Sequence, residues 1–290
     1  MTGHDDASAE AADTVGVLGG GTMGSGIAHV LLAAGMRTVL VEADGQSLER
    51  ATNLVRRSLT GAAERGKLSG DPDDVMARLD LTTDRAALSS CSLVIEAVPE
   101  ILELKRKLLA DIEAHLSETA VLATNTSSLA LADLASGLAR RDRFVGLHFF
   151  NPVPSSALVE IVRLDSTTDE TVERAQQLVA TLGKETITVT DSPGFATSRL
   201  GVALGLEAIR MLESGVASAE DIDRGMQLGY RHPMGPLRLT DLVGLDVRLG
   251  IAEYLSERLG ARFEPPTLLR SMVAEGKLGK KSGQGFYLWP

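Results

Sequence analysis

The glycine-rich segment Val15–Gly26 constrains the fold of this 290-residue chain more than any other feature. It reads V-G-V-L-G-G-G-T-M-G-S-G and matches the pattern G-x-G-x-x-G between a predicted strand and a predicted helix. In such a turn the first glycine permits a tight bend, the second lets a pyrophosphate approach the backbone, and the third lets helix and strand pack closely. We therefore predict a dinucleotide-binding α/β fold. The cofactor-binding residues predicted in this segment are Gly19, Gly21, Thr22, Met23 and Gly24.

Short β-branched runs alternate with helical patterns up to about residue 190, which is typical of a doubly wound α/β sheet. The predicted strands are Thr14–Leu18, Thr38–Glu42, Ser92–Ala97, Ala120–Thr124, Phe144–Phe149, Ala157–Val162 and Glu185–Thr190. The predicted helices between them are Thr22–Ala34, Gln46–Arg65, Glu100–His115 and Asp169–Leu182. Two prolines interrupt pairing in Asn151–Pro154, so we expect a loop between two strands there.

The strand pattern ends after Thr190, where Asp191–Gly194 interrupts the chain. The helices predicted beyond this break are Phe195–Ser214, Ser218–Leu228, Gly244–Gly260 and Pro265–Gly276. We therefore expect a Rossmann-type doubly wound domain over residues 14–190, followed by an all-helical C-terminal domain over residues 191–290. The break at Asp191–Gly194 is a candidate hinge for closure of a cleft.

The charge balance excludes several classes of partner. The chain has 39 acidic and 29 basic side chains and a formal net charge of −10, which argues against a nucleic-acid or anionic-membrane surface. Residues 1–13 contain four acidic side chains and no lysine or arginine, and we predict a disordered acidic tail there. We expect this tail to be neither a secretory signal nor a typical organelle presequence. The longest apolar stretch, Ile27–Met36, is too short to span a bilayer, so we expect a cytoplasmic protein.

The single cysteine, Cys91, excludes an internal disulfide framework and a cysteine-rich zinc site, and we expect no metal.

A carboxylate stands at the end of the second predicted strand. Glu42 follows Gly24 by 18 residues, where an acidic side chain accepts hydrogen bonds from the adenosine ribose of a bound dinucleotide. The same carboxylate would repel a 2′-phosphate, so the sequence favours NAD over NADP. The alternative is a glycine-rich turn of an α/β fold that holds no ligand.

A histidine and a glutamate occupy the two strands on either side of the proline loop. His148 lies at the end of Phe144–Phe149, and Glu160 lies on the next strand. A carboxylate that fixes the tautomer of a histidine and stabilises the imidazolium makes it a general base near neutral pH. The alternative is a buried histidine that pairs with a structural acid.

Ser127 follows Thr124–Thr126 at the carboxyl end of a predicted strand, the edge where ligands of open α/β sheets bind. Its structural alternative is a helix N-cap for the segment from Leu129 onward. A serine hydrolase is a poor match, because Ser127 lacks the G-x-S-x-G elbow.

Six segments, in order along residues 14–290, together resemble the L-3-hydroxyacyl-CoA dehydrogenase family, with bacterial 3-hydroxybutyryl-CoA dehydrogenases as the nearest branch. They are I-E-A-V-P-E at 95–100, T-N-T-S-S at 124–128, G-L-H-F-F-N-P at 146–152, S-P-G-F at 192–195, H-P-M-G-P at 232–236 and G-K-K-S-G-Q-G-F-Y at 279–287. The resemblance implies a NAD-dependent oxidation of L-3-hydroxyacyl-CoA to 3-oxoacyl-CoA, and a homodimer formed through the helical domain.

The resemblance also implies residue roles, motif by motif. His148 would be the catalytic base, Glu160 its partner, and Ser127 a ligand of the substrate oxygen. The cofactor contacts implied beyond the glycine turn and Glu42 are Glu100, Lys105, Ser127, Asn151 and Lys281. Lys105 is also expected near the CoA substrate. For the two lysines, the alternative is ordinary solvated charge on a helix or tail.

Ser198 departs from the family pattern, because S-P-G-F-A-T-S-R places a serine where a catalytic asparagine is expected. Asparagine presents a fixed NH₂ donor, whereas a serine hydroxyl is shorter and donates or accepts. We expect Ser198 to keep a hydrogen-bonding role, directly or through water, in an active enzyme.

An acidic protein that binds CoA needs a local patch of basic side chains to bind the phosphates of CoA. The helix after Glu42 offers Arg56, Arg57, Ser58, Arg65 and Lys67. The resemblance places Ser58 and Arg65 near CoA, and the alternative is a solvated helical face with no ligand.

Two other functions remain open. The first is a dehydrogenase of the same superfamily that acts on a 3-hydroxy acid without CoA, such as gulonate or carnitine. The second is a non-catalytic binding protein that retains the dinucleotide-binding domain. The set Ser127, His148 and Glu160 argues against the second function.

Overall fold

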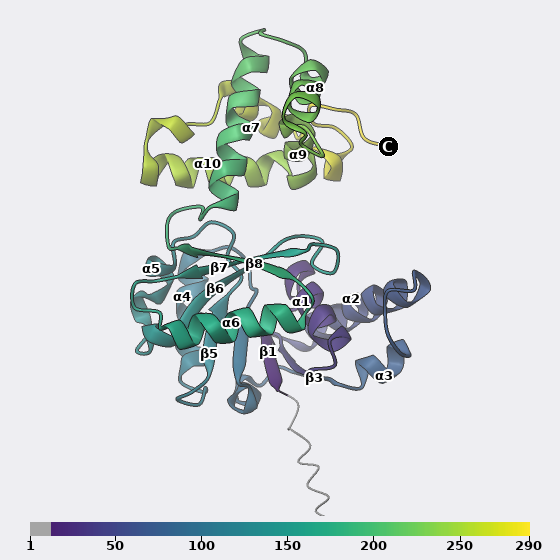
Figure 1. The fold of residues 1–290 in the computed structure, drawn as a ribbon, viewed down its shortest axis with the longest axis vertical. Helices are drawn as coiled ribbons and strands as arrows, with labels where there is room; N and C mark the ends of the chain where they lie inside the picture. The colour runs from purple at the N-terminus through teal and green to yellow at the C-terminus, as the bar shows by residue number, and fades with distance from the viewer. Residues whose placement is uncertain (1–12) are drawn as a thin grey trace, which may run out of the picture. The chain divides into compact units, whose positions relative to one another are not determined.

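The computed structural model describes residues 13–290 and divides the chain into two compact units between Asp191 and Ser192 (Figure 1). The acidic tail predicted over residues 1–13 lies outside the described residues, apart from Asp13. Asp13 faces Arg174, with 3.6 Å between its carboxylate and the guanidinium.

The first unit is built on one eight-stranded sheet with the strand order β3-β2-β1-β4-β5-β6-β7-β8. Its strands are β1 (Thr14–Leu18), β2 (Arg37–Val41), β3 (Leu79–Thr82), β4 (Leu93–Glu96), β5 (Val121–Thr124), β6 (Phe144–Phe149), β7 (Leu158–Arg163) and β8 (Glu185–Thr190). Every neighbouring pair is parallel except β6–β7, which is antiparallel. The predicted Rossmann-type doubly wound sheet is therefore confirmed, with the short strand β3 in addition to the seven predicted.

Helices cover the faces of this sheet. They are α1 (Thr22–Ala33), α2 (Gly45–Glu64), α3 (Pro72–Met76), α4 (Leu102–Glu113), α5 (Leu131–Leu134) and α6 (Asp169–Thr181). Figure 1 shows α6 crossing one face, where it packs against β6, β7 and β8. The central strands β4, β5 and β6 are buried along their whole length, as expected for strands covered on both faces. The short helices α3 and α5 were not among the predicted elements.

The glycine turn between β1 and α1 depends on one residue with a positive φ and on one close approach of the backbone. Gly19 has a φ of 91°, a conformation that L side chains rarely adopt. A Cβ at Gly24 would lie 1.7 Å from the carbonyl oxygen of Gly19, so only glycine lets α1 start this close to β1. A Cβ at Gly21, in contrast, would meet nothing within 4 Å. The turn thus packs tightly on the inside and leaves the backbone open at Gly21.

The second unit is helical. It contains α7 (Thr197–Glu213), α8 (Ala219–Tyr230), α9 (Pro236–Val243), α10 (Leu245–Leu259) and α11 (Thr267–Ala274), and α9 was not predicted. Its core brings together buried side chains of α7, α9 and α10, such as Leu206, Leu237 and Leu255. The buried carboxylate of Asp241 accepts hydrogen bonds from the backbone amides of Phe286 and Tyr287, which ties the end of the chain to α9.

Within residues 13–290, no helix combines the length and apolar character needed to cross a membrane.

Candidate functional site

The carboxyl ends of four neighbouring strands meet at one edge of the sheet. Leu18 of β1 pairs with Glu96 of β4, and Glu96 pairs with Thr124 of β5. The strand order reverses between β1 and β4, and ligands of open α/β sheets bind in the crevice at such a point. His148 lies one residue before the end of the next parallel strand, β6. The fold therefore places the predicted cofactor turn and the predicted base at the same edge.

Glu42 lies directly after β2 and is held by the glycine turn. One of its carboxylate oxygens accepts a hydrogen bond from the amide of Gly20 at 2.6 Å, and the other accepts one from the amide of Ala43 at 3.1 Å. Among the described residues, no side chain caps the amino end of α1, where Gly21 is the N-cap. An open amino end with a carboxylate beside it fits the pyrophosphate and adenosine ribose of NAD.

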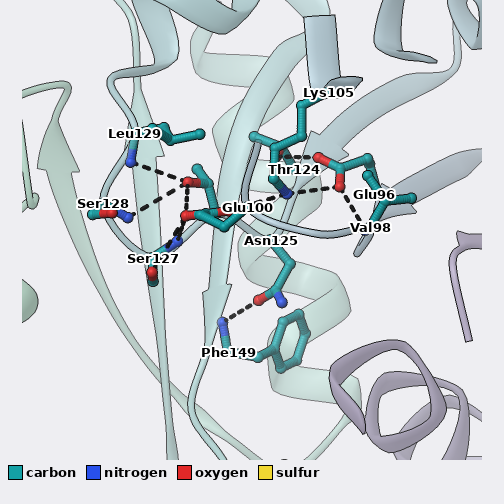
Figure 2. Close-up of polar contacts among 11 residues, drawn as sticks. Glu96, Val98, Glu100, Lys105, Thr124, Asn125, Ser127, Ser128, Leu129 and Phe149 are labelled. Atoms are coloured by element: carbon teal, nitrogen blue, oxygen red, sulfur yellow. Dashed lines mark hydrogen bonds and ion pairs between the residues drawn. The ribbon is translucent and has the colours of Figure 1, made fainter. Parts of the chain in front are cut away.

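A buried ion pair lies behind this edge. Lys105 of α4 and Glu96 at the end of β4 both have 0% side-chain exposure, and 2.7 Å separates Nζ from the carboxylate. The same carboxylate accepts hydrogen bonds from the Thr124 hydroxyl at 2.6 Å and the Val98 amide at 2.7 Å (Figure 2). Glu96 thus joins β4, β5, α4 and the loop that follows β4. The alternative of a solvated lysine at position 105 is wrong.

Glu100 connects this ion pair to the predicted serine. Its carboxylate lies 3.2 Å from Lys105 Nζ and accepts hydrogen bonds from the Thr126 hydroxyl at 2.6 Å and the Ser127 amide at 2.8 Å. The Ser127 hydroxyl lies 3.3 Å from the same oxygen (Figure 2). The structure therefore brings together Glu100, Lys105 and Ser127, which the sequence separates by up to 27 residues.

The N-cap alternative for Ser127 is wrong. The hydroxyl of Thr126, not that of Ser127, accepts the hydrogen bond from the Leu129 amide at 3.1 Å. Helix α5 begins only at Leu131, and the carboxylate of Asp191 accepts from the amides of Leu131 and Ala132. Burial raises the pKa of Asp191 above its ordinary value.

His148 and Glu160 are directly opposite each other in the antiparallel pair β6–β7. The imidazole Nδ1 lies 2.9 Å from the Glu160 carboxylate, and both side chains are buried. The next residue, Phe149, donates its amide to the side-chain oxygen of Asn125 at 2.9 Å, which ties the end of β6 to the segment after β5 (Figure 2). The ring of Phe150 packs against His148 at 4.4 Å between centroids. These contacts fix the ring of His148 in one orientation.

A cavity of about 190 Å³ brings together three more of the predicted residues. Thr22 of α1, Ser58 of α2 and Asn151 of the proline loop all line it. The proline loop packs closely on α1, because a Cβ at Gly26 would lie 2.9 Å from the side chain of Val153. The basic side chains nearby in sequence are exposed: Arg56 forms an ion pair with Asp73, and Arg65 ends α2.

Ser198 and Lys281 belong to the second unit. Ser198 is half-buried in the first turn of α7. The ammonium of Lys281 lies 2.6 Å from the carboxylate of Asp246. Their association with the residues of the first unit stays a prediction.

Two polar residues of this network were not predicted from the sequence, namely Glu96 and Thr124. Glu96 lies within the segment I-E-A-V-P-E, and its position at the end of a strand is the feature of the sequence that indicates its role. Two other buried groups have shifted pKa values, because burial lowers the pKa of His29 to about 4 and raises the pKa of Cys91 to about 11. Across residues 13–290 there is no cluster of three or more acidic, histidine or cysteine side chains that could hold a metal.

A glycine turn, a carboxylate after β2 and a polar cluster at one edge of a doubly wound sheet define a dinucleotide-dependent oxidoreductase. Comparison with known families identifies it further. Residues 14–192 match the 3-hydroxyacyl-CoA dehydrogenase NAD-binding domain, and residues 194–289 match the 3-hydroxyacyl-CoA dehydrogenase C-terminal domain. The chain belongs to the 3-hydroxyacyl-CoA dehydrogenase family of NAD-dependent oxidoreductases, and its cofactor is NAD.

Individual relatives are similar in sequence to this chain over nearly their full lengths. The chain is 42% identical to a 3-hydroxybutyryl-CoA dehydrogenase of Mycobacterium tuberculosis, over 97% of this chain and 99% of the relative. It is 41% identical to a probable 3-hydroxybutyryl-CoA dehydrogenase of Deinococcus radiodurans, over 94% and 98%. The crystal structure of (S)-3-hydroxybutyryl-CoA dehydrogenase PaaH1 from Ralstonia eutropha is similar with a TM-score of 0.91 and 40% identity, covering 96% of this chain and 99% of that one.

The buried ion pair makes a prediction about stability. Lys105→Met removes the ammonium and leaves the Glu96 carboxylate buried with two hydrogen bonds and no counter-ion, which costs about 3–5 kcal/mol. The free energy of unfolding from urea titrations should fall by that amount. The matched control is Arg37→Met, which breaks the exposed pair with Asp80 and should cost no more than about 1 kcal/mol. A loss below about 1 kcal/mol for Lys105→Met would contradict this account of the pair.

Proposed function

We propose that this protein oxidises L-3-hydroxyacyl-CoA to 3-oxoacyl-CoA with His148 and Glu160 as its general base, and that its substrate is 3-hydroxybutyryl-CoA. The buried hydrogen bond between these two side chains at the cofactor edge carries the proposal. The names of the relatives at 41–42% identity support the C4 substrate.

In the oxidation, the C3 hydroxyl proton leaves toward His148 as the C3 hydride leaves. Glu160 accepts from Nδ1–H, which leaves Nε2 as the proton acceptor and stabilises the imidazolium that forms. NAD, when bound, supplies the hydride acceptor. Phe149 and Asn125 keep the end of β6 in place, so the imidazole meets the substrate in one orientation.

Ser127 and Ser198 are proposed to hold the C3 oxygen. The Ser127 hydroxyl and amide are both within reach of the Glu100 carboxylate, which orients this serine at the end of β5. A hydrogen bond to an oxygen that gains charge in the transition state is worth about 2.7–4 kcal/mol where the geometry is best.

For the cofactor, the proposed contacts run along the carboxyl edge of the sheet. They are Gly19, Gly21, Thr22, Met23, Gly24, Glu42, Glu100, Ser127 and Asn151 of the first unit, with Lys281 of the second. Lys105 has no exposed surface, so we propose that it acts on the cofactor and substrate through Glu100 rather than by direct contact.

The helical unit is proposed to form a homodimer and to contribute to substrate binding. Exposed apolar side chains on α8, α9 and α10 support an interface there, among them Leu228, Tyr230, Leu242 and Val247. The mass of the protein in solution tests this.

The purified protein is expected to consume NADH with acetoacetyl-CoA, which can be followed as loss of absorbance at the NADH band. Acetoacetate without CoA is the matched control and should give no turnover. Turnover of the free acid alone would favour a dehydrogenase of CoA-independent 3-hydroxy acids. Binding of NADH without turnover of acetoacetyl-CoA or of a longer 3-oxoacyl-CoA would favour a non-catalytic binding protein.

Ser58 and Arg65 are proposed to contact the CoA moiety, because Ser58 lines the cavity between α1, α2 and the proline loop. The double substitution Arg56→Ala with Arg65→Ala removes basic charge from α2 and should raise the KM for acetoacetyl-CoA about tenfold, or about 1.4 kcal/mol, with kcat little changed. Arg37→Ala, at the amino end of β2, is the matched control and should leave KM unchanged. An unchanged KM in the double variant would contradict CoA binding at this patch.

A further inference from the structure

Three basic side chains of the first unit lie together beside the cavity between α1, α2 and the proline loop. His29 of α1 is only 4% exposed, and its imidazole Nδ1 has no hydrogen-bond partner within residues 13–290. Burial, with a further effect of the positive charges of Arg65 and Lys184, lowers the pKa of His29 to about 4. The ring is therefore neutral at neutral pH, and both cations lie close enough to act on it.

Helix geometry places His29 at one end of the cavity. Ser25 and Gly26 line the cavity, and His29 follows them by four and three residues on the same face of α1. Side chains of a helix point toward its amino end, so the imidazole lies over the turn that contains Ser25 and Gly26. A buried ring nitrogen without a partner destabilises a fold, so its retention beside a cavity points to a ligand.

Arg65 reaches the same end of the cavity from α2. Ser58 lines the cavity, and Arg65 follows it by seven residues, which is about two turns of helix. The guanidinium of Arg65 turns back along α2, since a Cβ at Gly61 would lie 3.1 Å from Nη1. The side chain is exposed, so its charge is available to a ligand.

Lys184 lies directly before β8 and holds the proline loop. Its ammonium donates hydrogen bonds to the carbonyl oxygens of Val153 at 2.8 Å and Ser156 at 2.5 Å, which leaves one N–H for another acceptor. The side chain of Val153 packs against α1 at Gly26, so the ammonium lies beside the loop that closes the cavity. Within residues 13–290, neither Lys184 nor Arg65 forms an ion pair with a carboxylate.

We propose that Arg65, Lys184 and His29 form an anion site that binds a phosphate group of the CoA moiety. The inference rests on the proposed function, because the acyl-CoA substrate supplies the phosphate. The two cations provide charge-assisted hydrogen bonds, and the neutral imidazole donates one more. Thr22, at the glycine turn, lines the other end of the cavity, about 10 Å from His29 along α1. A CoA with its thioester near the cofactor edge and a phosphate near His29 would therefore run along α1.

The test compares acetoacetyl-CoA with acetoacetyl-pantetheine, which has the same thioester and no phosphate. Lys184→Gln keeps N–H donors for the loop carbonyls and removes the charge, and His29→Leu removes the ring donor. In each variant the ratio of kcat/KM for acetoacetyl-CoA to kcat/KM for acetoacetyl-pantetheine should fall about tenfold, the loss expected for one hydrogen bond to a charged group. His29→Gln restores a donor and should keep this ratio within about threefold of the wild type. The matched controls Lys107→Gln and His115→Leu change exposed residues elsewhere in the unit and should leave the ratio unchanged.

Acetoacetyl-dephospho-CoA identifies the phosphate. A loss shared by this substrate assigns the site to the pyrophosphate, and a loss for intact CoA alone assigns it to the 3′-phosphate; both results support the anion site. An unchanged ratio in His29→Leu or Lys184→Gln would overturn it. Equal losses for acetoacetyl-CoA and acetoacetyl-pantetheine would indicate a purely structural role and overturn it as well, as would equal losses in His29→Gln and His29→Leu.

Calorimetric titration with free CoA separates this proposal from the proposed function. The dissociation constant of CoA should rise about tenfold in Lys184→Gln and in His29→Leu, independently of turnover. The melting temperature of His29→Leu should not fall, because the buried Nδ1 has no partner to lose. Equal CoA affinities in the wild type and both variants would overturn the anion site. A wild type that binds CoA through this site but reduces neither thioester would overturn the proposed function alone.

Discussion

The antiparallel pairing of β6 with β7 is the constraint on which the proposed chemistry of this protein depends. In a sheet whose other strands run parallel, this pairing sets His148 directly opposite Glu160. Because the side chains of a strand alternate between faces, a shift of one residue would move the imidazole to the other face and break the pair. The burial of β6 and of its parallel neighbour β5 prevents such a shift, since the side chains of both strands pack in the core. The proposed catalytic pair is thereby positioned by the sheet itself rather than by a loop.

Charged side chains lie together at the same edge of the sheet, and their burial would destabilise the fold if they had no partners. Glu96 is buried, yet its carboxylate accepts hydrogen bonds from Thr124 of β5, from the Val98 amide in the loop after β4 and from the ammonium of Lys105. Glu100 extends this network to Ser127 at the surface of the edge (Figure 2). Complete pairing of buried groups rigidifies a site, because any displacement leaves a group unsatisfied.

Much of the fold followed from local sequence patterns. The glycine turn and the apolar strands predicted a doubly wound sheet, because strands buried on both faces read as continuous apolar runs. The strand Leu79–Thr82 escaped prediction since it is short, only half-buried and interrupted by Asp80. The helices α3, α5 and α9 are too short for a helical period to stand out. The capping of α5 was beyond local reasoning, because Asp191 reaches it from 60 residues away.

The individual residues of the candidate site could be predicted from the sequence, but the contacts between them could not. The residue types and the resemblance singled out His148, Glu160, Ser127 and Glu100. The burial of Lys105 and the role of Glu96 could not be derived, because both depend on which strands become neighbours.

The most direct test of the central claim is the rate of 3-hydroxybutyryl-CoA oxidation in Glu160→Gln, measured beside the affinity for NAD. The substitution keeps the shape of the side chain and removes the charge that stabilises the imidazolium of His148. The account predicts that kcat falls by about 10²–10⁴ while NAD binds as in the wild type. A kcat within threefold of the wild type, with the variant folded and NAD bound, would contradict the account.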